Sequence, residues 1–277
     1  MKKFLRSPVV TGLMFLIALA LLVTGSIGTT QAALQIRSEN HVSTYALKHI
    51  GVTLRENGNA IAYRNYGSKA ASGFTEVQNG NIVLSNLGSD KQVKVGKQYP
   101  CAITAQNTGT IDQYVRVTIR KYWVKDVGDP GGKGWFKFNS GSQTKITDDI
   151  YNPAYILLNV NAGDAINNYN ETNWYRGDSP SKECEVYYYK GILKPNETTA
   201  PLFNYLAISN DISMYKDKIV KVTTEGNTTI YTYAFDGYGF VIEAEVDAVQ
   251  THHARAAMIS AWGTDVNVMN QIGLPNE

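Results

Sequence analysis

The stretch 107–124, NTGTIDQYVRVTIRKYWV, is the most regular pattern in the sequence and constrains the fold more than any other feature. It opens with a turn signal at Asn107-Thr108-Gly109 and then alternates between polar or aromatic residues and apolar ones. A period of two predicts a long β-strand with one face in the core of a sheet protein. The residues predicted to face that core are Val115, Val117, Ile119 and Trp123.

Three basic residues of the same stretch refine this prediction. Arg116 and Arg120 fall on the opposite parity and are expected in solvent. Lys121 falls on the apolar parity, where a buried charge is costly, so a β-bulge or an exposed strand end is predicted there. Because the strand carries no catalytic motif, we interpret it as the central wall against which a second sheet packs.

Short strands separated by turn signals are predicted along the rest of the chain. They cover 33–37, 49–57, 81–87, 152–160, 185–193, 195–209 and 239–250, with a hairpin at 218–235 that turns at Glu225-Gly226-Asn227. This pattern predicts an all-β protein, an antiparallel jelly roll or β-sandwich with long loops. Loop-rich insertions are predicted near 57–100, 126–150 and 161–184 because Gly, Asn and Ser are frequent there.

The segment 239–250 alternates as cleanly as the opening stretch. Ile242 and Val246 lie on its apolar parity and are predicted core residues. Glu243, Glu245 and Asp247 lie on the other parity. We interpret this acidic row as a solvated strand face, with a cation-binding row as the alternative.

One short C-terminal helix is predicted at 251–263. Thr251 is the expected N-cap and Gly263 the expected end, and the alanines between them favour helix. Met258, Ile259 and Trp262 fall on one helical face, so Trp262 joins the predicted core and the helix is expected to cap an open end of the sandwich.

The N-terminus is typical of an export leader. Basic residues in the first six positions precede an apolar run at 13–23, and small or polar residues follow up to Ala32. We predict a signal peptide at 1–32, cleaved by a signal peptidase between Ala32 and Ala33, and a single domain at 33–277. The alternative is a retained membrane anchor, because 9–27 holds no charge. The expected location is secreted, extracellular or on the cell surface, with membrane contact only through the uncleaved leader.

Charge and cysteine content bound the classes of partner. The chain holds 26 Lys and Arg against 24 Asp and Glu, a net charge of +2, so no nucleic-acid partner is predicted. The two cysteines, Cys101 and Cys184, begin strand-like runs. Outside the cytoplasm they either form a disulfide or remain two buried free thiols, and the sequence leaves both open because it gives no distance between them.

Catalytic and metal motifs are missing from the sequence. The four histidines, His41, His49, His252 and His253, do not occur in a zinc-binding pattern, and adjacent residues on a helix point in different directions. We therefore predict no catalytic residue, no metal ligand and no cofactor, and interpret the protein as a non-enzyme.

Four blocks, in this order, carry a resemblance to a known family. The first is GSIGTTQAALQIRSENHVSTYALKHIGVTLRENG (25–58), which is similar to exported fibre proteins cut by a dedicated signal peptidase. The second is the central stretch, through Trp123. The third is YYYKGILKPNETTAPLF (187–203), and the fourth is EVDAVQTHHARAAMISAWG (245–263). Together they resemble the TasA/camelysin family of biofilm-matrix fibre proteins, while the intervening loops are not matched.

The resemblance implies a secreted jelly-roll subunit of extracellular matrix fibres. It implies that each subunit donates its N-terminal strand, here Ala33 to Arg37, to the next copy or to a related matrix subunit. Leu34 and Ile36 would be the side chains that fill the acceptor, once the leader is removed. Some family members are described as metalloproteases, but the matching zinc motif is absent from this sequence.

Two other functions remain open from the residues alone. A monomeric cell-surface module could bind a glycan or a host protein through the aromatic residues Tyr63, Tyr66, Trp174 and Tyr175. A secreted metalloprotease is the third and the least favoured reading, because no motif supports it.

Overall fold

The computed structural model describes residues 9, 12–19, 48–66, 76–84, 87, 92–125, 135–138, 144–215 and 219–274. The chain divides into two units, Met1–Ala46 and Leu47–Glu277. Within the first unit, residues 12–19 of the predicted leader are helical. None of the described helices has the length and apolar character needed to span a bilayer. The predicted cleavage residues Ala32 and Ala33 and the predicted donor residues Leu34 and Ile36 lie outside the described residues.

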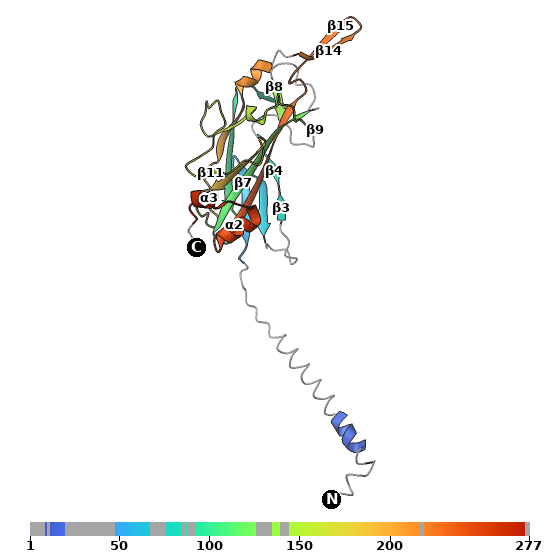
Figure 1. Ribbon diagram of the computed structural model, residues 1–277, viewed down its shortest axis with the longest axis vertical. Helices are drawn as coiled ribbons and strands as arrows, with labels where there is room; N and C mark the ends of the chain where they lie inside the picture. Colours follow the sequence, from blue (N-terminus) through green and yellow to red (C-terminus); the bar gives the residue numbers. More distant parts are fainter. Residues whose placement is uncertain are drawn as a thin grey trace. The chain divides into compact units, whose positions relative to one another are not determined.

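The second unit is an all-β sandwich of two sheets (Figure 1), as predicted. Sheet A has the order β10 (Ile156–Asn159), β13 (Phe203–Ile208), β6 (Gln98–Asn107), β1 (Ile50–Glu56), β2 (Asn59–Tyr66) and β3 (Glu76–Gln78). Sheet B has the order β11 (Trp174–Arg176), β12 (Cys184–Tyr189), β7 (Gln113–Lys125), β16 (Gly239–Gln250), β8 (Trp135–Phe138) and β5 (Gln92–Lys94). Strand β4 (Gly80–Asn81) also pairs with β16, and β9 (Thr144–Lys145) pairs with β7. All strand pairs are antiparallel in the described residues except β8 with β16.

The predicted central strand is the interior strand β7 of sheet B. It lies between β12 and β16, and β16 pairs with it from Gly239 opposite Val124 to Gln250 opposite Gln113 without a register shift. The β-bulge predicted at Lys121 is therefore wrong, since Lys121 pairs in register with Ile242. The predicted core residues of the two strands, Val115, Val117, Ile119, Trp123, Ile242 and Val246, are all buried.

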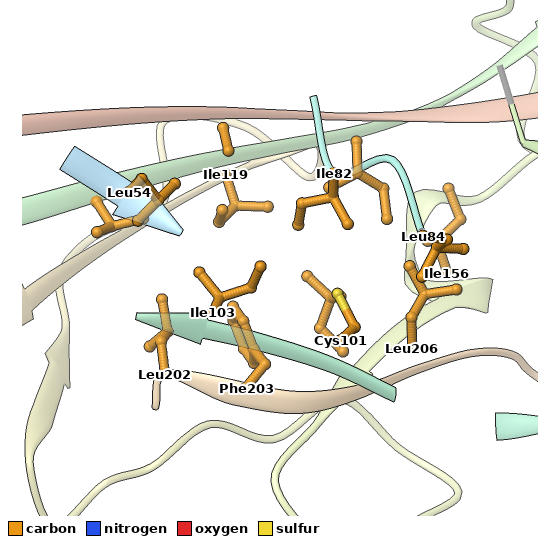
Figure 2. Close-up of a cluster of buried hydrophobic side chains, with 14 of the residues drawn as sticks. Leu54, Ile82, Leu84, Cys101, Ile103, Ile119, Ile156, Leu202, Phe203 and Leu206 are labelled. Atoms are coloured by element: carbon orange, nitrogen blue, oxygen red, sulfur yellow. The ribbon is translucent and has the colours of Figure 1, made fainter. Parts of the chain in front are cut away.

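The core lies between the two sheets and is largely aliphatic. Figure 2 shows Leu54 of β1 and Ile103 of β6 from sheet A facing Ile119 of β7 from sheet B. Trp123 closes this core in an aromatic group with Phe235 and Phe240, at ring-centroid distances of 5.3 and 6.0 Å. Its indole nitrogen donates to the carbonyl oxygen of Asn152 at 3.0 Å, which satisfies the polar atom of a fully buried ring.

The region 57–100 is more regular than predicted. It was expected to be loop-rich, but it holds β2, β3, β4, β5 and the start of β6. The composition did not indicate these strands for two reasons. Strand β2 carries Asn and Arg at half-buried positions, and β3, β4 and β5 are only two or three residues long. Short edge strands of this kind are too brief to show a period of two.

Two short helices follow β16, α2 (Ala254–Trp262) and α3 (Val266–Gln271). The N-cap of α2 is His253, in the left-handed region and without a side-chain bond, so the predicted Thr251 cap is wrong. The predicted end at Gly263 is confirmed, since Gly263 has a φ of 62° and donates to the carbonyl oxygen of Ile259. Ile259 is 55% exposed, so the predicted apolar face is only partly correct.

The helices cover a face of sheet B rather than an end of the sandwich. Met258 and Met269 are fully buried and pack with Tyr114, Val186 and Tyr188, which point away from the main core. The predicted core residue Trp262 is half-buried in this second cluster, tilted against Tyr188 at 5.9 Å. This placement corrects the expectation that the helix would close an open end.

The predicted hairpin forms a small sheet of its own, β14 (Ile219–Glu225) and β15 (Thr228–Tyr233), at the end of the unit opposite α2 and α3 (Figure 1). The predicted turn is confirmed, with Gly226 at a φ of 61°. Val222 and Tyr231 pair across the hairpin and are both more than half exposed. The hairpin therefore contributes little to the core.

Candidate functional site

The acidic row of β16 is the first candidate site, and it is not solvated as predicted. Asp247 is only 1% exposed, and its Oδ2 lies 2.5 Å from Nη2 of Arg116 on β7. Glu245 accepts from Nη1 of Arg120 at 3.2 Å. The expectation that Arg116 stays in solvent is also wrong, since its guanidinium lies 5.1 Å from the ring centroid of Trp262. Glu245, Asp247 and these arginines together form an ion-pair ladder across the outer face of sheet B.

A third arginine, which the sequence did not suggest, joins the ladder from the other sheet. Arg64 of β2 donates to Oε1 of Glu245 at 2.7 Å, and its second Nη contacts Asp247. Burial opposes its charge, but the hydrogen bond with Tyr66 and the two carboxylates outweigh burial and raise its pKa. No local pattern marks Arg64, because Glu245 lies 181 positions further along the chain.

The open edge of β16 is the second candidate site. One edge of this strand is fully paired with β7. On the other edge, β8 pairs with Gly239 and Phe240, and β4 pairs with Glu243 and Ala244. No strand among the described residues pairs with that edge from Glu245 to Gln250. Unpaired backbone groups on a long interior strand form a template for an added strand.

Two hollows lie beside the ends of this open edge. One, of about 270 Å³, is lined by Glu245, Arg120 and the β4 residues Gly80 and Asn81. The other, of about 820 Å³, is lined by Gln250, by the start of β1 and by Tyr66 at the end of β2. The unpaired run of β16 therefore lies between two concave regions of the surface, and its residues Val246, Asp247, Ala248 and Val249 are themselves buried.

The other described edges of sheets A and B are short or closed. Strands β3, β5 and β11 have three residues each. The outer edge of β10 is covered by a loop, because Asn168 donates its backbone N–H to the carbonyl oxygen of Leu158 and its side chain accepts from the N–H of Val160. Such capping prevents strand addition. Among the described edges of sheets A and B, that of β16 offers the longest unpaired run, while the separate hairpin of β14 and β15 has unpaired outer edges of its own.

Lys121 lies inside the sandwich rather than at an exposed strand end. Its side chain is almost fully buried, and Nζ donates to the carbonyl oxygen of Ile156 at 3.1 Å and to Oδ1 of Asn167 at 3.0 Å. Oε2 of Glu185 lies 3.5 Å from the same nitrogen. Burial lowers the pKa of Lys121, and the charge of Glu185 partly opposes that shift. The sequence therefore predicted correctly that Lys121 points inward. The β-bulge or exposed strand end predicted from that orientation is absent at this position.

The two cysteines are free, and they lie in different clusters. Cys101 of β6 is fully buried among Ile103 and Leu206 in the main core (Figure 2). Cys184 of β12 belongs to the second cluster, on the opposite face of sheet B. Of the two alternatives for these residues, the structure therefore has the buried free thiols. Burial raises the pKa of both thiols, which keeps them unreactive.

The aromatic residues considered for glycan binding do not form one surface. Trp174 is fully buried, packs edge-on against Tyr189 and donates to the carbonyl oxygen of Ala200 at 3.0 Å. Tyr175 packs against the cluster under the helices. Tyr63 and Tyr66 lie on β2 in the other sheet. The four rings therefore cannot together stack on one sugar chain.

Titratable side chains show no metal-binding arrangement in the part of the chain that the structure describes. No group of three or more His, Cys, Asp or Glu side chains is placed there to hold an ion. His252 and His253 are exposed, with ring centroids 4.0 Å apart. In the acidic row, Glu245 and Asp247 pair with arginines and Glu243 accepts a hydrogen bond from the hydroxyl of Tyr122 at 2.7 Å, which leaves the cation-binding alternative without support.

Comparison with known proteins gives no assignment. No family model matches the chain, and neither the curated proteins nor the solved structures give a significant match.

Proposed function

We propose that this protein is a secreted structural subunit of extracellular fibres, and that each copy donates residues Ala33 to Arg37 to the open edge of β16 in the next copy. The observation that carries the proposal is the unpaired run from Glu245 to Gln250 on an otherwise paired strand. An added strand would satisfy those backbone groups and complete the sheet.

Length and polarity of the predicted donor support this edge as its acceptor. The segment 33–37 is one residue shorter than the open run 245–250. Its apolar residues Leu34 and Ile36 share one parity, and they would lie on the face of sheet B where Val246 is buried. Arg37 lies on the other parity, so it would share the face of the ion-pair ladder.

The same geometry explains why polymers rather than closed pairs are expected. A donor at one site and an acceptor at another make a head-to-tail contact, and repetition without closure gives a filament. The leader would block the donor end, so its removal between Ala32 and Ala33 would permit assembly. The resemblance to biofilm-matrix fibre proteins points to the same function.

Acidic substitutions test the proposal, because they should block assembly at the inward-facing donor positions and be tolerated at the outward-facing one. We expect Leu34→Asp with Ile36→Asp to abolish fibres of the processed protein in electron micrographs, because two carboxylates would enter the core. Gln35→Asp is the matched control and should still form fibres, since that residue shares the parity of Arg37 and would lie away from the core. Fibres of normal abundance from the double variant would refute donation by this segment.

Peptide binding tests the acceptor separately. A protein lacking residues 33–37 should bind a synthetic peptide of residues 33–40 and should not bind the peptide with aspartate at 34 and 36. Protection of the β16 amides from hydrogen exchange by the peptide would locate the binding edge. Processed protein that sediments as a monomer under all conditions would favour the binding-module alternative instead.

A further inference from the structure

A lysine, an asparagine and a glutamate from three separate segments meet inside the sandwich. Lys121 comes from β7, Glu185 from β12 and Asn167 from the loop that follows β10. Nζ of Lys121 lies 3.0 Å from Oδ1 of Asn167 and 3.5 Å from Oε2 of Glu185. The lysine is 1% exposed, and the fibre proposal uses none of the three residues.

Burial shifts the Lys121 amine toward its neutral form, against the opposing charge of Glu185. Tyr187 is buried beside them, donates to Oε2 of Glu185 at 3.0 Å and contacts the rings of Tyr169 and Phe203 at 5.3 Å. Burial lowers the pKa of Lys121 for the same reason that it raises the pKa of Tyr187, since each charged form is poorly solvated. A neutral lysine amine is a nucleophile.

The amide of Asn167 is held as an electrophile would be. Its Oδ1 accepts from the backbone N–H of Leu158 at 2.8 Å as well as from Lys121. Its Nδ2 donates to the carbonyl oxygen of Ala154 at 3.2 Å, which fixes the orientation of the amide plane. A backbone N–H directed at a carbonyl oxygen stabilises the negative charge that develops there when a nucleophile adds.

We propose that Lys121 and Asn167 join in an intramolecular isopeptide bond, with Glu185 as the group that transfers protons. The neutral Nζ attacks Cγ of Asn167, and Glu185 takes the proton that Nζ loses as the new C–N bond forms. The N–H of Leu158 stabilises the resulting oxyanion. Glu185 returns the proton to Nδ2, the Cγ–Nδ2 bond breaks, and nitrogen leaves as ammonia. One amide replaces another, so no oxidant, metal or further reactant is required.

The bond would fasten the two sheets together. Lys121 belongs to sheet B, while Asn167 belongs to the loop whose Asn168 caps the edge strand β10 of sheet A. A covalent link at this point would hold that cap in place when the molecule is pulled or heated. Such a link suits an extracellular protein with free cysteines and no disulfide in its described residues.

Mass spectrometry of the purified, folded protein tests the bond without any variant. We expect an intact mass lower than the sequence mass by one ammonia. Tryptic mapping should show Lys121 uncleaved and linked to the peptide that carries Asn167, which distinguishes the bond from cyclisation of another asparagine or glutamine. A folded protein with the full sequence mass and a free Lys121 peptide would overturn the proposal.

Variants test the roles of the three residues. Asn167→Ala and Lys121→Met should retain the full mass, and Glu185→Gln should do so while keeping the size of the side chain. Glu183→Gln is the matched control, because Glu183 is a neighbouring carboxylate that pairs with Lys145, and it should remain cross-linked. A wild-type yield of the cross-link in Glu185→Gln would overturn the role assigned to Glu185.

Discussion

The side-chain nitrogen of Asn107 lies 2.8 Å from the carbonyl oxygen of Leu193, and this contact fastens the end of β6 to a distant loop. The same nitrogen donates to the carbonyl oxygen of Ile111, and Oδ1 of Asn107 accepts from the backbone N–H of Gly109. Asn107 is fully buried, so these are the bonds that satisfy it. The turn signal in the sequence therefore marks a junction of three segments.

Removal of this junction should be costly. Asn107→Ala removes three hydrogen bonds of a fully buried side chain, so we expect a loss of about 3 kcal/mol in the free energy of unfolding. Urea denaturation measures it. Asn267→Ala, at an exposed position of α3, serves as the control and should change the free energy by less than about 0.5 kcal/mol. Equal losses in both variants would contradict the assigned role.

The ion-pair ladder should depend on Asp247. Asp247→Asn keeps the shape of the side chain but removes the negative charge that pairs with Arg64 and Arg116. We therefore expect a loss of about 3 kcal/mol in the free energy of unfolding. Because the pair is shielded from solvent, the loss should persist at high salt. Glu225→Gln, in the exposed hairpin, is the control for loss of one carboxylate. A salt-dependent loss would show that the ladder is solvated.

Close approach of β4 to β2 should make Gly80 irreplaceable. A Cβ at Gly80 would lie 1.8 Å from the carbonyl oxygen of Ile61, so Gly80→Ala must displace backbone. We expect a loss of about 2 kcal/mol and faster hydrogen exchange of the Ile82 amide, which donates to Ile242 at 3.0 Å. Asn79→Ala next to it should leave both unchanged, and normal exchange at Ile82 in the glycine variant would contradict the expectation.

Alkaline pH should destabilise the fold. Burial, with help from Glu185, raises the pKa of Tyr187, and burial, with help from Glu56, raises the pKa of Cys101. The folded state therefore keeps protons that the unfolded state loses, and stability falls as pH rises above about 9 for the thiol and about 10 for the phenol. Each group contributes about 1.4 kcal/mol of loss for each pH unit beyond that point.

Denaturation midpoints measured from neutral to alkaline pH check this sign. Tyr187→Phe should reduce the fall above about pH 10, because it removes one proton that only the unfolded state releases. Tyr231→Phe, at a half-exposed position of the hairpin, should leave the slope unchanged. A midpoint that rises with pH in the wild-type protein would contradict the direction of both shifts. The titratable groups that act on the pKa of Tyr187 are Glu185 and Tyr169, which raise it, and Arg176, which lowers it.

Local periodicity was sufficient for the strands that pack on the core. The alternation of 107–124 and 239–250 predicted β7, β16 and their buried residues. Side chains on one parity of a strand face the second sheet, and those on the other parity face away from it. Gly226 and Gly263 likewise predicted a turn and a helix end, since both require a left-handed backbone conformation. These features depend on neighbours within a few residues.

Contacts between distant segments were decided only by the tertiary structure. The sequence placed Lys121 on the inward parity, but it could not supply Asn167 and Glu185 as partners, and it could not bring Arg64 to Asp247. The same limit applies to the cysteines, which were each predicted to begin a strand and which point into different clusters. Hydrophobic patterning determines which face of a strand is buried, whereas the pairing of charges depends on which strands the fold makes neighbours, and no local pattern encodes that.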